Sequence, residues 1–94
     1  MKIIWDERKR ISNLAKHGFD FEQIDHFDWV NAVFGAAHMS RYGQRRLKAT
    51  GVLSGSIVIV IFALLGSEAI SLISLRPASA RERKEFLWSR STRH

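Results

Sequence analysis

The chain has 94 residues, which is enough for one domain, and we expect that domain to span residues 1–94. A hydrophobic content of 46% argues against a disordered chain, and the absence of cysteine excludes disulfides and thiolate zinc sites. The 15 Lys and Arg residues outnumber the 9 Asp and Glu residues, and the net charge of +6 favours an anionic partner such as RNA, DNA or an acidic protein.

The N-terminal part of the chain predicts a short strand followed by a helix. Residues 2–5 read as the strand, and Asp6 is a suitable N-cap for a helix that reaches residue 16 or 17. Gly18 fits the left-handed position that commonly follows a helix. The predicted helix is strongly basic, and its one narrow apolar stripe consists of Ile11, Leu14 and Ala15.

A second, short helix is predicted to follow Asp20. Asp20 and Gln23 have the spacing of a capping box, in which each side chain bonds the backbone of the other residue. The expected buried side of this helix consists of Phe21, Ile24 and Phe27.

The middle of the chain predicts further strands, separated by a loop over residues 35–43 and by turns at Ser54-Gly55 and Gly66-Ser67. The run 57–63 is apolar on both faces, which is typical of a central strand. The expected strands are residues 28–34, 45–52, 57–63 and 69–76.

The last helix has the clearest start, because Ser79 and Glu82 form the Ser-x-x-Glu capping box. Phe86 and Leu87 are its expected apolar contacts, and residues 89–94 read as a polar tail. The element order predicts the α+β class, with a mainly antiparallel sheet of four to five strands in a meander, two N-terminal helices and one C-terminal helix.

No segment predicts a membrane location. The apolar run 57–65 is far shorter than the about 20 residues that a spanning helix needs. Charged residues begin at Lys2, which argues against a signal peptide. We therefore expect a cytoplasmic protein without a membrane partner.

His17 and Lys16 are the first candidates for chemistry. Histidine titrates near neutral pH and can exchange protons, and the helix dipole should favour its charged form at a helix C-terminus. Lysine can stabilise a phosphate. The alternative is that both are surface residues at a helix end, and on sequence alone that alternative is the stronger one.

Arg46, Lys48 and Arg76 are the next candidates, because arginine suits phosphate recognition through its planar fork. Strand alternation places Arg46, Lys48 and Thr50 on one face, opposite Leu47 and Ala49. Arg76 ends a strand just before a helix, on the predicted face of Ile70, Leu72 and Ser74. It is expected either to bind phosphate or to pair with a carboxylate such as Asp6 or Glu82.

Two further arginines and the metal-binding residues complete the survey. Arg81 and Arg83 are expected to be solvated helix charges or contacts to RNA. The histidines are spread along the chain without metal-ligand spacing, so neither a metal site nor a cofactor is expected.

With these residues, the chain resembles the BrnT-type ribonuclease toxins of bacterial type II toxin–antitoxin systems. The resemblance covers most of the chain. It runs from Ile4-Trp5-Asp6, Asn13, Lys16-His17-Gly18 and Phe21-Glu22 through Arg46 and Gly51 to Ile73-Ser74-Leu75-Arg76, Ala78-Ser79 and Arg81-Glu82-Arg83. The chain departs from the family pattern at Leu47, where an aromatic residue is usual, at Leu75, where alanine is usual, and at Gln44 and Arg45, where acidic residues are usual.

The resemblance implies a RelE-like fold and a metal-independent endoribonuclease that inhibits translation and growth. It also implies a BrnA-like antitoxin that neutralises the toxin, and a hetero-oligomeric complex that contacts operator DNA through the antitoxin and represses its own operon.

As a mechanism, we expect the RNA's own 2′-hydroxyl to be the nucleophile. Arg46 and Arg76 would then bind the phosphate, and Lys16 or His17 would transfer the proton. Lys48, Arg81 and Arg83 are expected to bind RNA. The alternatives are a nucleic-acid-binding module without activity and a protein-interaction subunit.

Overall fold

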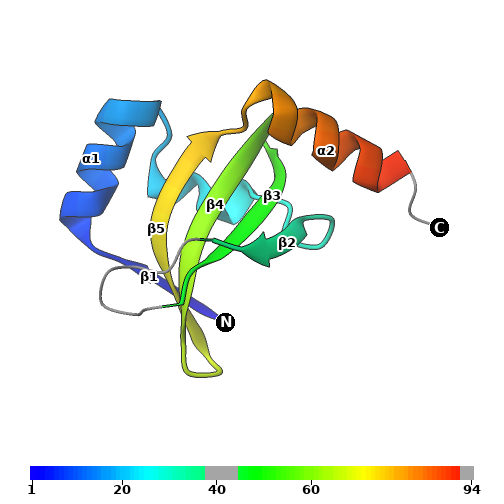
Figure 1. The fold of residues 1–94 in the computed structure, drawn as a ribbon. Coiled ribbons are helices and arrows are strands. Elements are labelled where there is room, and N and C mark those ends of the chain that lie inside the picture. The colour runs from blue at the N-terminus through cyan, green and yellow to red at the C-terminus, as the bar shows by residue number, and fades with distance from the viewer. Residues whose placement is uncertain (38–44, 92–94) are drawn as a thin grey trace.

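The computed structural model describes residues 1–37 and 45–91. Its core element is one five-stranded sheet, with two helices at one end and a 3₁₀ helix behind it (Figure 1). The strands are β1 (Lys2–Trp5), β2 (Val33–Ala36), β3 (Leu47–Leu53), β4 (Ser56–Leu65) and β5 (Ala69–Pro77). The helices are α1 (Glu7–His17), η1 (Phe21–His26) and α2 (Ala80–Ser91).

The sheet is mixed, with the strand order β1-β5-β4-β3-β2. The pairs β2–β3, β3–β4 and β4–β5 are antiparallel, and β4 is the central strand, as its two-sided apolar sequence predicts. The prediction of an antiparallel meander is wrong for β1, which pairs with β5 in parallel. The α+β class is confirmed, while the RelE-like relationship stays a prediction.

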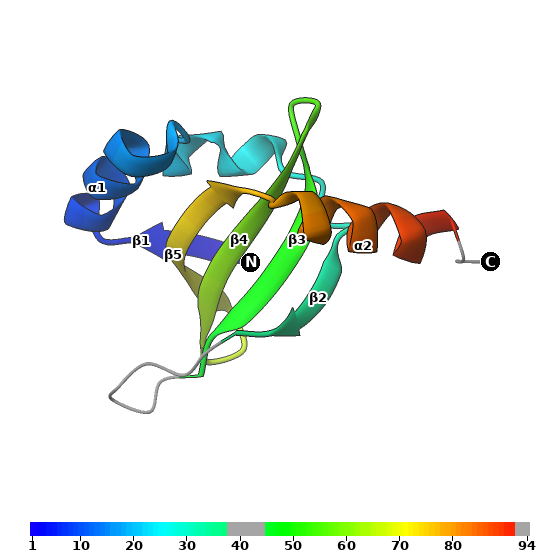
Figure 2. The same cartoon turned by 45° about the horizontal axis from the view of Figure 1, so that its top comes forward.

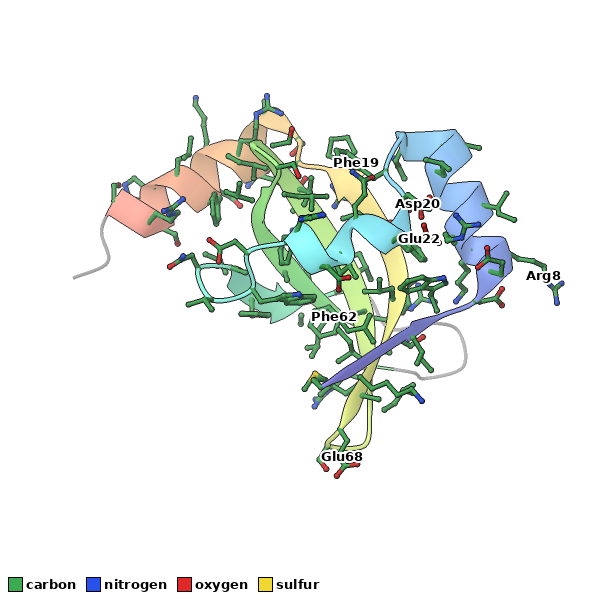
Figure 3. All side chains as sticks on the ribbon, turned by 180° about the vertical axis from the view of Figure 1, so that it is seen from behind. Arg8, Phe19, Asp20, Glu22, Phe62 and Glu68 are labelled. Atoms are coloured by element: carbon green, nitrogen blue, oxygen red, sulfur yellow. The ribbon has the colours of Figure 1, made fainter. Side chains whose placement is uncertain are left out.

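The hydrophobic core lies on one face of the sheet, beneath η1 and the segments that flank it. Figure 2 shows η1 on this face and α2 crossing the opposite face, and Figure 3 shows Phe62 of β4 on the side of η1. The predicted capping box of Asp20 and Gln23 is present, although the helix is a 3₁₀ helix. The expected buried side is confirmed: Phe21, Ile24 and Phe27 are at most 5% exposed.

Several predicted boundaries need correction. The strand expected at residues 28–34 begins only at Val33, because residues 28–31 form a turn in which the Asp28 carboxylate accepts hydrogen bonds from Asn31. Gly35 and Ala36, expected in a loop, belong to β2, and residues 38–43 of that loop lie outside the described residues. The helix α2 extends to Ser91, so residues 89–91 are not part of a tail. Leu87, an expected apolar contact, is 55% exposed.

Gly51 of β3 has no room for a side chain. A Cβ atom there would lie 2.7 Å from Cζ of the buried Phe27 ring and 3.3 Å from Cβ of Ala32. We expect Gly51→Ala to lower the free energy of unfolding by about 1–3 kcal/mol, because the packed ring must shift. Urea denaturation measures this loss. In the control Gly35→Ala the new methyl meets nothing within 4 Å, and an equal loss in both variants would contradict the packing argument.

The helix α1 is attached to the sheet by a polar residue. Asn13, which is 7% exposed, donates from Nδ2 to the carbonyl of Leu75 at 2.8 Å and to that of Phe19 at 3.0 Å, and its Oδ1 accepts from the Leu75 N–H at 3.1 Å. The strand β1 pairs with β5 only as far as Leu72, so Asn13 bonds the backbone of β5 beyond the end of β1. The apolar stripe of this helix does not anchor it, since Ile11, Leu14 and Ala15 are exposed.

We expect Asn13→Leu to destabilise the fold strongly. The substitution keeps the branched shape of the side chain but leaves buried backbone groups of Leu75 unpaired, and each such group costs about 1–3 kcal/mol. Chemical denaturation gives the change in unfolding free energy. The matched control is Asn31→Leu, where the one lost bond, from Nδ2 to the Asp28 carboxylate, is exposed and the loss should be much smaller. Equal losses at the two positions would show that Asn13 has no special role.

Candidate active site

A β-bulge turns Arg76 away from the core. Ile61 pairs with Ser74 while the next residue, Phe62, pairs with Leu72, so Ile73 is an extra residue in β5. One extra residue reverses the alternation of side chains along a strand. The prediction that Arg76 shares a face with Ile70 and Leu72 is therefore wrong: these two are buried in the core, and Arg76 faces the open side of the sheet together with Ser74.

The open side carries a basic cavity of about 400 Å³ between α1 and the sheet. Three of the predicted catalytic residues meet here, because Lys16 and His17 at the end of α1 line the same cavity as Arg46. Arg8 and Lys9 add two further positive charges, and no carboxylate belongs to the lining. The other lining residues are Ser12, Asn13, Ile73 and Ser74.

Arg46 lies just before β3, and its carbonyl accepts a hydrogen bond from the N–H of Ala37. The predicted alternation is confirmed, since Lys48 and Thr50 line cavities on the open side whereas Leu47 and Ala49 contact the core. The Nε of Arg46 is buried and has no hydrogen-bond partner within residues 1–37 and 45–91. A buried donor that no described group satisfies is costly, and a functional role is one explanation for keeping it.

The surroundings of His17 favour its neutral form. Its pKa lies below the ordinary value of 6.5, first because of desolvation and then because of the positive charges of Lys16 and Arg76. This shift is opposite in direction to the one expected from the helix dipole, because burial and two neighbouring cations favour the neutral form. A neutral imidazole can accept a proton, so His17 has the protonation state of a general base.

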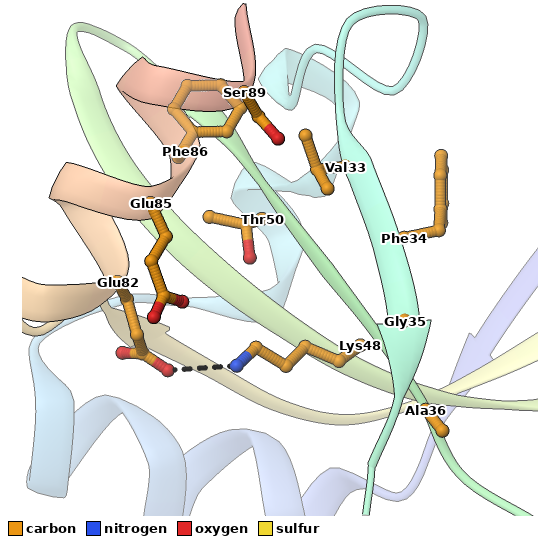
Figure 4. Close-up of a pocket in the computed structure, with 10 residues that line it drawn as sticks. All are labelled: Val33, Phe34, Gly35, Ala36, Lys48, Thr50, Glu82, Glu85, Phe86 and Ser89. Carbon is orange, nitrogen blue, oxygen red and sulfur yellow. Dashed lines mark hydrogen bonds and ion pairs between the residues drawn. The ribbon is translucent and has the colours of Figure 1, made fainter.

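Glu82 connects α2 with two cations of the sheet. Its Oε1 and Oε2 accept from Nη1 and Nη2 of Arg76 at 2.8 and 3.0 Å, and its Oε2 also accepts from Nζ of Lys48 at 3.1 Å (Figure 4). The predicted capping box is present, with the Ser79 N–H bonding Oε1 of Glu82. The Arg76 guanidinium holds the pKa of Glu82 well below its usual range, so this carboxylate stays ionised. The structure therefore brings Arg76 to a carboxylate, the second of its two predicted partners.

A second cavity, of about 390 Å³, lies beside this charge cluster. Arg76 and Lys48 provide its polar side chains, and Ala36, Ala37 and Ile61 complete the lining. In the sheet register Ile61 pairs with both Lys48 and Ser74. Because Ser74 lines the α1 cavity, one row of residues across the sheet connects the two cavities.

The groove beneath α2, unlike the two cavities described above, contains carboxylates in its lining. It measures about 280 Å³ and includes the carboxylates of Glu82 and Glu85 next to Lys48 and Thr50 (Figure 4). Arg81 and Arg83 do not line any of these three cavities: Arg81 pairs with Glu85, and Arg83 donates to the carbonyl of Ala78 at 2.8 Å. The structure does not bring these two arginines together with the other candidates.

Sequence reasoning missed two residues of the site. Glu82 appeared only as a capping residue and as a possible partner of Arg76, and its bond to Lys48 was not foreseen. Asn13 appeared only as part of a motif, although its spacing from Lys9 and Lys16 places all three on one side of the helix. That helical spacing is the signal that locates the α1 side of the cavity.

Two features are absent from the described residues, a metal-binding group of side chains and a membrane-spanning helix. Among them, no three His, Cys, Asp or Glu side chains are grouped so that they could hold a metal ion. No helix among them is long and apolar enough to cross a membrane.

The chain is similar to known proteins of one family. The family model of the ribonuclease toxin BrnT of type II toxin–antitoxin systems matches residues 5–82. The 1.1 Å crystal structure of the Brucella abortus ribonuclease toxin BrnT is similar, with 45% sequence identity and a TM-score of 0.64. The match covers 84% of this chain and 97% of that one. No curated protein matches the chain.

Proposed function

Because the chain belongs to the family of BrnT ribonuclease toxins of type II toxin–antitoxin systems, we propose that it is a metal-independent endoribonuclease. Cleavage of cellular RNA in the cytoplasm would inhibit translation and growth. One observation carries the proposal. The cavity beside α1 combines Arg46, whose buried Nε has no partner among the described residues, with a His17 whose neutral form is favoured and with no carboxylate in the lining.

In the proposed reaction, Arg46 binds the phosphate and His17 takes the proton of the adjacent 2′-hydroxyl. The 2′-oxygen then forms a bond to phosphorus while the bond from phosphorus to the 5′-oxygen breaks. Lys16 lines the same cavity and donates a proton to that leaving oxygen. The products are a 2′,3′-cyclic phosphate and a 5′-hydroxyl.

Arg76 contributes in a different way from Arg46. Its guanidinium already binds Glu82 with both Nη atoms, so its positive charge is partly compensated by that carboxylate. We propose that Arg76 stays in place and acts on the α1 cavity through its positive charge, the same charge that lowers the pKa of His17. Arg81 and Arg83 would touch only flanking parts of the RNA.

A protein antitoxin follows from membership of a type II toxin–antitoxin family. We propose that a BrnA-like antitoxin forms a hetero-oligomer with this chain and blocks the basic cavity. The complex would bind operator DNA through the antitoxin and repress its own operon.

The test is cleavage of RNA by the purified chain in excess EDTA. We expect fragments with 2′,3′-cyclic phosphate ends, and no cut where the substrate carries a 2′-deoxyribose at the scissile position. Addition of the protein encoded by the adjacent gene should stop cleavage. RNA that is bound but not cut would instead support a nucleic-acid-binding module, and cleavage that disappears in EDTA would overturn metal independence.

A further inference from the structure

The two cavities of the open face differ in how far their positive charge is compensated. Four cationic side chains line the cavity beside α1 together with His17, and no carboxylate does. In the neighbouring cavity, Arg76 and Lys48 share the carboxylate of Glu82, which leaves a net charge of +1 for the three groups. A phosphate is therefore attracted more strongly to the α1 side.

The cavity between Arg76 and Lys48 instead offers oriented hydrogen-bond donors. A guanidinium has five N–H donors. Glu82 and the Pro77 carbonyl engage both of the Nη1 donors of Arg76 and one of its Nη2 donors, so that, within the described residues, the adjacent Nε and Nη2 donors remain. Lys48 uses one of three donors on Oε2, the same oxygen that Nη2 of Arg76 bonds. Glu82 thus holds both cations close together.

The rest of this cavity is small and apolar. Ala36, Ala37 and Ile61 supply no polar side-chain atom, so its lining side chains offer donors and no acceptor. Its volume of about 390 Å³ is within the range of about 300–1,000 Å³ that is usual for small-ligand sites. An apolar floor beside fixed donors suits a flat aromatic ring with acceptors on its edge.

We propose that this cavity is a base-reading subsite that takes a guanine of single-stranded RNA, with Arg76 and Lys48 donating to O6 and N7. Arginine or lysine on these two acceptors is the commonest specific contact to guanine. Adenine is disfavoured because its amino group would meet donors. Bases of single-stranded RNA are free to enter such slots. The subsite rests on the proposed ribonuclease function, since the row from Lys48 through Ile61 to Ser74 connects it to the phosphate cavity.

The first test uses mononucleotides and needs no cleavage. The wild-type chain is titrated with GMP, AMP, CMP and UMP, and binding is followed by NMR shifts of β3 and β5 amides. We expect GMP to bind tightest, by about tenfold over AMP. Equal affinities for all four nucleotides would overturn the subsite. If the chain binds GMP preferentially but never cuts RNA, the subsite is supported and only the proposed ribonuclease activity is contradicted.

The second test compares Lys48→Met with Lys9→Met, both in the full chain. Each substitution removes one positive charge, but Lys9 lines only the phosphate cavity. On oligonucleotides that differ in one base, Lys48→Met should lower cleavage of the guanine substrate by about tenfold relative to the others, whereas Lys9→Met should slow all substrates alike. A uniform loss in both variants would show that Lys48 contacts phosphate and would overturn the proposal.

Discussion

Arg46→Ala is expected to lower kcat/KM for RNA cleavage by about 10²–10³-fold, as is usual when one donor to a developing charge is removed. The physical reason is the buried Nε, which no described protein group satisfies and which lies in a cavity without a carboxylate. Steady-state kinetics with a fluorogenic RNA in EDTA measure the effect.

The stability of the same variant gives a second readout. Because Arg46 has a buried donor without a partner among the described residues, its removal should leave the free energy of unfolding unchanged or raise it. A residue kept for stability would show the opposite. Lys2→Ala is the charge-matched control, since Lys2 is an exposed residue of β1 and lines none of the three cavities of the open face. Undiminished cleavage by a folded Arg46→Ala variant would refute the proposed phosphate site.

Local signals in the sequence located most elements because local chemistry determines them. The caps at Asp6, Asp20 and Ser79 each bond the helix that they precede, as predicted. Gly18 takes the left-handed conformation, with a φ of 76°. These features depend on residues three or four positions apart, so a sequence shows them directly.

The predictions that proved wrong concern places where segments distant in the sequence meet. The parallel pairing of β1 with β5 joins residues 2–5 to residues 69–72, and no local pattern announces it. The bulge at Ile73 has the same cause, because an extra residue is visible only once β4 supplies the register. The bulge decides whether Arg76 faces the core or the open side, so the site could not be assembled from strand alternation alone.

The candidate site likewise combines residues that the sequence indicates with contacts that only the fold reveals. Arg46, Lys16 and His17 were candidates because of their residue types, and the structure places them around one cavity. Glu82 joins Arg76 and Lys48 across three elements, which sequence spacing cannot show. Glu82 partly neutralises the positive charge of Arg76 and Lys48, whereas the cavity around Arg46 has no carboxylate in its lining. The different proposed roles of Arg46 and Arg76 follow from this difference in charge.

His17→Asn is expected to lower kcat by about 10²–10⁴-fold, the usual contribution of a general base. The pH dependence identifies the group. Since the pKa of His17 lies below 6.5, the base is free at neutral pH, and kcat/KM should fall only as the pH drops through that lowered value. The asparagine variant should retain its residual activity without this acidic limb. An acidic limb that survives in His17→Asn would assign the titration to another group.

The positive charges beside His17 predict how its pKa changes when one of them is removed. Lys16→Met removes one of the two positive charges that lower the pKa of His17, so its acidic limb should move to higher pH, toward 6.5. Lys9→Met is the matched control: Lys9 lines the same cavity, but its charge is not among the causes of the lowered pKa. The control should slow the reaction without moving the limb. Because burial is the largest cause of the lowered pKa, the shift in Lys16→Met should be partial, and a limb that stays in place or moves to lower pH would contradict the proposed electrostatics of the site.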